Sequence, residues 1–279
     1  MLEDMRSLIL IIAKVTFPFL LCFLPTHLFA EGHNIEQKVK WDKYADDIDV
    51  ARVSVWQQSV ISPELLLIRS SLNRYRLGVI RAADYGLLHA NVRALSKKAK
   101  SIMAINANFF DEHGKALGLV ISRGIKHQKM HSSGGTLTGV FQVSQNGISI
   151  INRANFNPHL VIEAVQAGPR LLVNGLPVKQ IKEADTYSRR AGVCLDKNNN
   201  VIFFISSGLM GISFHQVQDI LNSHGIDCVN ALNFDGGGSA QFYLTNKLDL
   251  LQNKNLQEIF IQGRDNIPVA IGLFKKDIQ

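Results

Sequence analysis

The chain has 279 residues, of which 46% are apolar and 19% are charged. This length and composition predict one large domain or two small ones with a sizeable core, and they exclude general disorder. The net charge of +7 favours a negatively charged ligand, but the basic residues are scattered along the chain. The densest group, Lys97-Lys98-Lys100, ends a predicted helix, where lysines interact with the helix dipole. We therefore expect no nucleic-acid partner.

Residues 1–30 are predicted to be a signal peptide. With translation from Met5, Arg6 supplies the positive charge, Val15–Leu24 the apolar core and Ala30 a small residue before the cleavage site. The alternative is an uncleaved membrane anchor, so contact with a membrane is expected only through this leader. Both interpretations predict export, to the periplasm or the extracellular space.

The next segment, Glu31–Asp49, is polar and is predicted to be a short N-terminal arm, with the folded domain covering residues 50–279. Within this domain, alternating segments and short apolar runs bounded by turn residues predict many β-strands. In chain order we expect strands at Val50–Trp56, Leu65–Ile68, Arg76–Ile80, Ser101–Ala107, Leu117–Ser122, Gly139–Ser144, Ile148–Asn152, Leu160–Gln166, Leu171–Val173, Ala191–Leu195, Val201–Ser206, Cys228–Phe234, Gln241–Leu244 and Pro268–Phe274.

Two helices interrupt the strands. The first is predicted to begin at Asp84 and to bury Leu88, Val92, Leu95 and Ala99, which recur at helical spacing. The second is predicted to begin at Ser213, which forms a capping box with Gln216. Many strands in hairpin-like succession with few helices predict an α+β fold of largely antiparallel or mixed sheets with a few packed helices, in one domain.

Two cysteines, Cys194 and Cys228, remain once the leader is removed. They either pair in an oxidising compartment or act as small core residues, and the residues alone favour neither. Cysteines and histidines form no HxxxH, HxH or CxxC arrangement, so a zinc site of the usual kind is not expected.

The strongest motif is Phe234-Asp235-Gly236-Gly237-Gly238-Ser239, which follows an apolar strand. Consecutive glycines are costly to order, so another group is expected to approach this backbone closely or the turn to adopt positive φ. Free N–H groups in such a turn form an anion-binding nest, which suits a phosphate. Asp235 would repel a phosphate, so we expect it to face a reacting carbon or a metal. The alternative is a plain tight turn.

A second motif, Asn106-Ala107-Asn108, places two amides on one face of a strand, where they are able to hold sugar hydroxyls. Asp111 follows at the next turn, and an Asx-turn is at least as good an interpretation for it. Two further segments, Arg189-Arg190 and Gly263-Arg264, each precede a strand. Their guanidinium groups either pair with surface carboxylates or hold a phosphate.

Taken together, the blocks NANFFD, GPRLLVNG, RAGVCLD, ALNFDGGGSAQFYL and GRDNIPVAIGLF occur in an order that resembles the phosphodiester glycosidase domain family, that of the lysosomal uncovering enzyme. The resemblance runs from about Ser101 to Phe274. Asn108 stands where the family has a glycine. The family's Arg-Thr-Ala aligns with Arg190-Ala191-Gly192, so the resemblance gives the site role to Arg190 rather than Arg189, and the threonine hydroxyl is missing.

The resemblance implies a hydrolase that cleaves the bond between a sugar's anomeric carbon and a phosphodiester, releasing free sugar. Asp235 is then the catalytic carboxylate, and the phosphate is bound by Arg190, the backbone of Gly236–Gly238 and Arg264, beside Ser239. Asn106 and Asn108 are expected to position the sugar. A second carboxylate is expected as well, and the candidates are Asp111 and Glu163.

Two alternatives stay open. One is an envelope protein that binds anionic glycans without turning them over, and the other is a phosphodiesterase that cuts a P–O bond, although its usual His/Asp ligand set is not found. No cofactor is required by these residues, and calcium at the Asp235 loop is a hypothesis.

Overall fold

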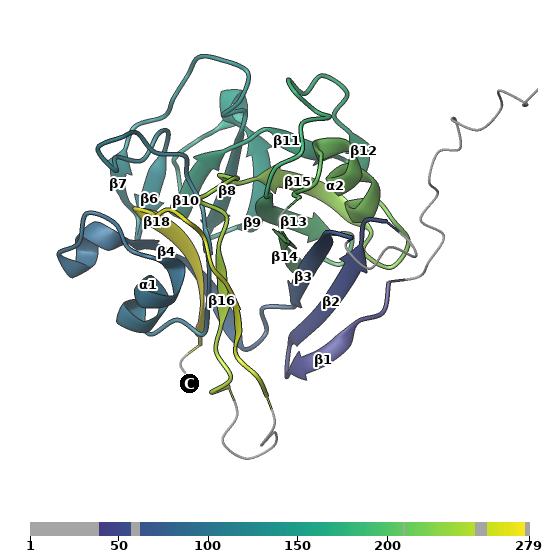
Figure 1. Cartoon of the computed structure of the whole chain (residues 1–279). Helices are drawn as coiled ribbons and strands as arrows, with labels where there is room; N and C mark the ends of the chain where they lie inside the picture. Colours follow the sequence, from purple (N-terminus) through teal and green to yellow (C-terminus); the bar gives the residue numbers. More distant parts are fainter. Residues whose placement is uncertain (1–38, 57–61, 209, 249–255, 277–279) are drawn as a thin grey trace, which may run out of the picture. The chain divides into compact units, whose positions relative to one another are not determined.

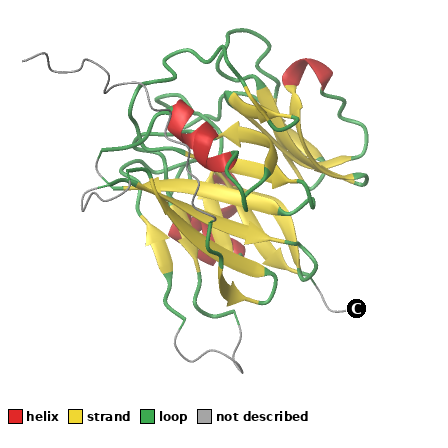
Figure 2. Ribbon diagram, turned by 90° about the vertical axis from the view of Figure 1, so that its right-hand side faces the viewer, coloured by secondary structure: helices red, strands yellow, loops and turns green. Residues whose placement is uncertain are grey.

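The computed structural model describes residues 39–56, 62–208, 210–248 and 256–276, all within one unit, Ile35–Gln279. Strands dominate these residues, and the α-helices among them are two short ones (Figure 2). The predicted antiparallel sheets are confirmed. The predicted α+β class is met only in part, because helices form a small share of this β-dominated fold.

The described strands form three antiparallel sheets (Figure 1). The eight-stranded sheet has the order β1 (Asp42–Ala45), β2 (Ile48–Ser54), β3 (Glu64–Ser70), β14 (Val201–Ser207), β13 (Ala191–Asp196), β15 (Cys228–Asn233), β11 (Arg170–Val173) and β12 (Leu176–Pro177). One five-stranded sheet has the order β7 (Ile125–Gln128), β6 (Val120–Ser122), β10 (Val161–Ala167), β8 (Gly139–Ser144) and β9 (Gly147–Asn152). The other has the order β17 (Ile259–Ile261), β16 (Phe242–Leu244), β5 (Met103–Asn106), β18 (Val269–Lys275) and β4 (Tyr75–Arg81).

The central strands of the large sheet are buried on both faces, which explains their continuous apolar runs. On β3, Leu66 and Ile68 join the main core, which also contains residues of the two smaller sheets. Leu65 and Leu67 point to the other face and pack in a second cluster with the apolar side of α2 (Phe214–Leu221). The large sheet therefore separates the two smaller sheets from this helix, and α2 lies along β11 and β15 in Figure 1.

Of the two predicted helix starts, the second is confirmed and the first is wrong. Ser213 caps α2 with the reciprocal hydrogen bonds of a capping box to Gln216. The other helix, α1 (Val92–Ala99), begins after Asn91, whose side chain accepts a hydrogen bond from the Ala94 amide.

Asp84 lies instead in a separate 3₁₀ turn, Ala82–Tyr85, which ends at Gly86 with φ +70°. The Asp84 carboxylate pairs with Arg81 at 2.7 Å and with Arg123 at 3.3 Å. Leu88, assigned from the sequence to the buried face of this helix, is 65% exposed. The left-handed glycine breaks the helical pattern that the apolar spacing had implied.

The folded part also begins earlier than predicted. Residues 42–49 of the expected arm form β1 and the start of β2, while residues 31–38, like the whole leader, lie outside the described residues. Tyr44 is buried, and its hydroxyl donates to the carbonyls of Thr245 and Gln257. The polar composition of this segment conceals single buried residues such as Tyr44 and Ile48.

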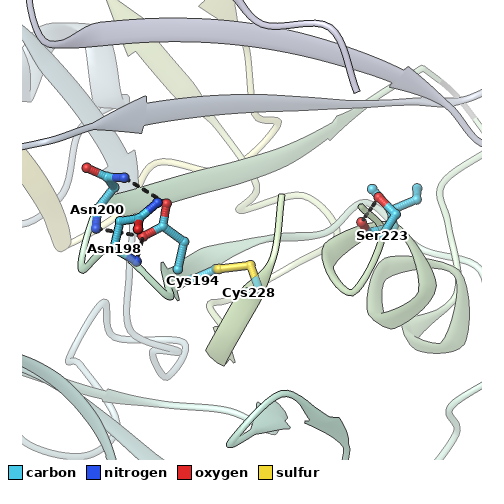
Figure 3. The surroundings of a disulfide bond; sticks show 7 residues. Cys194, Asn198, Asn200, Ser223 and Cys228 are labelled. Carbon is cyan, nitrogen blue, oxygen red and sulfur yellow. Dashed lines mark hydrogen bonds between the residues drawn. A yellow bond between two sulfur atoms is a disulfide. The ribbon is translucent and has the colours of Figure 1, made fainter. Parts of the chain in front are cut away.

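Three short strands, β7, β12 and β17, were not predicted, because they are edge strands with few buried side chains. Cys194 on β13 and Cys228 on the neighbouring β15 form a disulfide, with Cα atoms 5.9 Å apart (Figure 3). The pairing alternative is thus confirmed over the free-thiol alternative. None of the helices in the described residues is long and apolar enough to cross a membrane.

Candidate active site

The glycine loop leaves the end of β15 and crosses the ends of two other strands. The Phe234 amide donates to the Ala191 carbonyl at the start of β13, and the Asp235 amide donates to the Ala107 carbonyl just after β5. These bonds extend the pairing of β15 beyond its last residue. As a result, Asp235 lies where the large sheet meets the sheet that contains β5.

Close approach of neighbouring groups explains the glycines. A Cβ atom on Gly238 would overlap the carboxylate of Asp265, and one on Gly236 would lie 2.6 Å from the Arg189 carbonyl oxygen. Gly237 adopts φ +56°. The sequence-based expectation of close approach and positive φ is therefore confirmed.

Some amides of the predicted anion nest donate hydrogen bonds within the protein. The Gly237 N–H donates to the Arg189 carbonyl at 2.9 Å, and the Gly236 N–H donates to the Asp235 carboxylate. The Ser239 N–H closes the loop on the Gly236 carbonyl. Because the Gly237 amide already donates to a backbone carbonyl, it is not free for a phosphate in this structure, and the assignment of the Gly236–Gly238 backbone to phosphate stays a prediction.

Asp235 and Asp265 are a pair of carboxylates that share the hydroxyl of Ser239. This hydroxyl donates to Asp265 Oδ2 at 3.3 Å and also hydrogen-bonds the Asp235 carboxylate. Burial raises the pKa of Asp235 to about 6, the negative charge of Asp265 adds to the rise, and hydrogen bonds from Ser239 and Gly236 oppose it. A hydroxyl has one proton, so it donates to one carboxylate at a time. When the other carboxyl group is protonated, it donates a hydrogen bond to the hydroxyl oxygen, and the two carboxyl groups are then linked through Ser239.

Asp265 is held by the backbone around it. The amides of Arg264 and Asp265 both donate to the Gly238 carbonyl, at 2.7 and 3.1 Å. Gln241, which is fully buried, donates from Nε2 to the Asp265 carbonyl at 2.8 Å. Sequence reasoning missed Asp265, although it lies in the GRDN block next to the arginine that was selected.

Neither predicted second carboxylate lies at this pair. Glu163 is buried on β10 and accepts hydrogen bonds from the amides of Val79 and Arg123 at 2.8 and 3.1 Å. Burial raises its pKa. Asp111 accepts from the amides of His113 and Lys115 and so forms the Asx-type turn named as the alternative.

The two asparagines expected to bind sugar instead brace the backbone. Asn106 donates to the Asp235 carbonyl at 2.6 Å and accepts from the Gln241 amide at 3.0 Å, so it positions the catalytic candidate. Asn108 donates to the carbonyls of Gln166 and Leu119. Both are almost completely buried and donate to backbone carbonyls, and their role in sugar binding stays a prediction.

Arg190 is buried, and its side chain is largely committed to the protein. Its Nη2 donates to the Thr186 carbonyl at 2.6 Å, its Nε donates to the Ile212 carbonyl at 3.2 Å, and its guanidinium lies 3.7 Å above the ring of Phe214. Burial lowers the pKa of Arg190 to about 10, so the group stays charged at neutral pH.

Arg190 lines a hollow of about 340 Å³ together with Asn233, Pro169 and Gly236. We call it the inner hollow. It reaches the glycine loop at Gly236, next to Asp235 in the chain. Asn233 was not selected from the sequence, yet its amide donates to the carbonyls of Gly168 and Phe234 and so ties the turn before β11 to the glycine loop.

The family resemblance favoured Arg190 over Arg189. Burial lowers the pKa of Arg189, and repulsion from the nearby Arg264 lowers it further. Neither side chain has a carboxylate partner among the described residues. The two arginines therefore lie near each other, and each contacts the glycine loop through its backbone, Arg189 at Gly237 and Arg264 at Gly238. In the described part of the chain, no three His, Cys, Asp or Glu side chains gather in the manner of a metal site.

Comparison with known proteins identifies the family of this chain. The phosphodiester glycosidase family profile matches residues 99–274. The uncharacterized protein YigE of Escherichia coli K12 is 30% identical over 130 residues, which is 44% of this chain and 51% of that protein, so the match spans about half of the relative's length.

Two solved structures share the fold. The catalytic domain of zebrafish N-acetylglucosamine-1-phosphodiester alpha-N-acetylglucosaminidase, auto-inhibited by its pro-peptide, superposes with a TM-score of 0.61 at 19% identity, over 88% of this chain and 86% of that one. A hypothetical protein from Synechocystis gives a TM-score of 0.58 at 18% identity, over 86% and 64%. With its profile match covering more than half of the sequence, this chain belongs to the phosphodiester glycosidase family.

Proposed function

We propose that this protein hydrolyses the bond between the anomeric carbon of a sugar and a phosphodiester oxygen, releasing free sugar and a phosphate monoester. The observation that carries the proposal is the carboxyl pair of Asp235 and Asp265, joined through Ser239. The family's name and the zebrafish relative's title support a sugar-1-phosphodiester as the substrate class.

A carboxyl pair in which burial raises the pKa of Asp235 suits this reaction. Hydrolysis at an anomeric carbon needs a carboxylate near the oxocarbenium-like centre and a group that takes a proton from water. Since the pKa of Asp235 is raised to about 6, this group changes protonation state near neutral pH, where acid–base work is most effective. We assign Asp235 to the reacting centre and Asp265 to the exchange of its proton through Ser239.

The leaving group also has candidate partners. A phosphate monoester departs readily, so it needs charge stabilisation more than protonation. Arg189 and Arg264, which lack carboxylate partners in the described structure, are the groups we assign to this role, in place of the glycine amides. The inner hollow, with the charged Arg190 on its wall, adjoins the loop and offers space for the rest of the substrate.

We further propose that the protein is exported to the periplasm or the extracellular space. The buried disulfide between Cys194 and Cys228 supports this, because such bonds persist in oxidising compartments. The leader that predicts export lies outside the described residues, and it remains the only membrane contact that we expect.

Product analysis tests the proposed activity. Purified protein is incubated with methyl-capped N-acetylglucosamine-1-phosphodiester, and reducing sugar and phosphate products are separated by chromatography. We expect free sugar from the wild type and none from Asp235→Asn or Asp265→Asn, whereas Asp111→Asn retains activity because its turn keeps a side-chain acceptor. Release of sugar-1-phosphate supports a phosphodiesterase, and binding without release supports the non-catalytic glycan-binding protein.

A further inference from the structure

The inner hollow is one end of a longer groove. It shares Gly135 and Pro169 with a second hollow of about 410 Å³. That middle hollow in turn shares Asn152 and Arg170 with a third, outer one of about 510 Å³. Hollows that share lining residues adjoin, so the groove leads from the glycine loop past β11 to the edge strand β9. A single sugar phosphate would fill only the inner end.

Arg170 lines both the middle and the outer hollow, and its charge is uncompensated. Burial lowers the pKa of its guanidinium, and no carboxylate of the described residues forms an ion pair with it. Its Nε is buried without a hydrogen-bond partner among those residues. An unpaired, half-buried guanidinium costs folding free energy, so its presence needs an explanation, and a ligand that is missing from the structure supplies one.

The fold directs this side chain into the groove. The Arg170 amide donates to the Thr138 hydroxyl, and the aliphatic part of the side chain passes over Gly139 on β8, where a Cβ atom would lie 2.8 Å from Arg170 Cγ. The absence of a side chain at position 139 thus leaves room for Leu232 and for the arginine. The guanidinium is held at the junction of two hollows by packing, not by an ion pair.

Other charged groups in the middle and outer hollows already have partners. Arg153 donates to the carbonyls of Ser133, Gly134 and Leu137 and so holds the loop that covers the middle hollow. The carboxylate that lines the outer hollow belongs to Asp196, and it accepts hydrogen bonds from the amides of Asn198 and Asn200 and from the Asn200 side chain. Lys197 also lines the outer hollow, but it pairs with Asp227 at 2.7 Å, so Arg170 is the cation of these two hollows that lacks a partner among the described residues.

The outer hollow is also rich in amide side chains. Asparagines 152, 155, 174, 199 and 230 line it. Amides offer both donors and acceptors, which suits the hydroxyl groups of sugars. The Arg170 guanidinium suits a phosphate and the neighbouring amides suit sugar hydroxyls, so the hollow fits a chain in which phosphates and sugars alternate.

We propose that this groove binds a glycan chain with several phosphodiester links, and that Arg170 holds a phosphate of a repeat other than the one being cleaved. The position of the cleaved repeat rests on the proposed function, whereas binding in the groove does not depend on it. The substrate class is then a repeating sugar-phosphate polymer rather than a single sugar phosphodiester.

The test compares methyl-capped N-acetylglucosamine-1-phosphodiesters of one and four repeats, with binding measured by calorimetry in the Asp235→Asn background so that nothing is consumed. We expect the four-repeat oligomer to bind about tenfold more tightly than the single repeat, and Arg170→Gln to remove this difference while single-repeat binding is unchanged. Lys126→Gln is the control, since it removes one charge from the exposed strand β7, outside the groove lining.

Two results would overturn the proposal. One is equal binding of both oligomers by a protein with Arg170 intact, and the other is an equal loss for both oligomers in Arg170→Gln. Thermal melting separates a structural role: we expect Arg170→Gln to melt no lower than the parent, because it removes an unpaired charge, and a lower melting temperature contradicts the account. Because binding is measured without turnover, failure of the hydrolase assignment leaves this result readable.

Discussion

Replacing Asp235 by asparagine is expected to abolish hydrolysis and at the same time to stabilise the protein at neutral pH. The pKa of Asp235 is raised from its usual 3.8 to about 6, chiefly by burial. The charged form is therefore the unfavourable one in the folded state. Since each tenfold change in an acid constant corresponds to about 1.4 kcal/mol, the cost of ionisation is about 3 kcal/mol at most. Partial exposure of the side chain lowers it to about 2 kcal/mol.

The dependence on pH follows from the same shift. Between about pH 4 and pH 6 the folded state binds more protons at Asp235 than the unfolded state does, so the wild type loses stability as pH rises through this window. Asparagine does not titrate. The stabilising effect of Asp235→Asn is therefore expected to be near zero at pH 4 and to reach its full size above pH 6.

Urea denaturation at several pH values from 4 to 8 measures this difference. Asp111→Asn serves as the control and is expected to stay within about 0.5 kcal/mol of the wild type, because asparagine keeps the acceptor of the turn. If Asp235→Asn destabilises the protein at pH 7, or if its effect is the same at pH 4 and pH 7, the reasoning on burial is refuted.

The remaining predictions concern the buried Glu163, the disulfide and the glycine loop. Glu163→Gln leaves one of two bound backbone amides without an acceptor, so we expect the free energy of unfolding in urea to fall by about 1–3 kcal/mol. Activity per folded molecule is expected to be unchanged, and a loss of it would contradict a purely structural role. The double variant Cys194→Ala/Cys228→Ala removes a cross-link between residues 34 apart and is expected to lose about 3–4 kcal/mol of stability, which an unchanged denaturation midpoint would disprove. Gly238→Ala places a methyl group against the Asp265 carboxylate and is expected to lower kcat by about 100-fold. Gly237→Ala has no neighbour nearer than 3.8 Å, so it strains only the backbone and is expected to lower the free energy of unfolding by about 1 kcal/mol. Equal kcat values in the two variants would contradict the packing argument.

Features that depend on nearby residues could be predicted from the sequence. The capping box of α2 needs only Ser213 and Gln216, and the runs that became β3 and β14 are apolar enough to indicate burial on both faces. Tyr44 shows where such patterns fail. Its neighbours are polar, and the groups that bury it come from about 200 residues further along the chain.

The site itself depends on contacts between distant segments. Asp265 reaches the glycine loop because β17 pairs with β16, with Ile261 opposite Phe242, and the chain then returns to Gly238. The sequence shows no sign of this pairing, since β17 is short and half-buried. The residue type was also misleading for Asn106, because an asparagine that binds sugar and one that braces a backbone look alike in a sequence.

The arginines illustrate the same limit. The resemblance to the family selects Arg190, and the structure shows that its guanidinium bonds to protein carbonyls and stacks on Phe214. The neighbouring Arg189 lies near the distant Arg264 instead, and neither forms an ion pair with a carboxylate of the described residues. Which of two adjacent arginines faces a ligand depends on the pleat at the start of β13, and a one-residue change of register reverses it.

Hydrolysis in water enriched in ¹⁸O tests the central claim most directly, because it identifies the bond that breaks. If the carboxyl pair acts at the anomeric carbon, water adds to that carbon and the phosphate monoester keeps its original oxygens. Mass spectrometry of the phosphate product is then expected to show no ¹⁸O. A phosphate monoester that carries one ¹⁸O atom would mean that water attacks phosphorus, and it would contradict the roles assigned to Asp235 and Asp265.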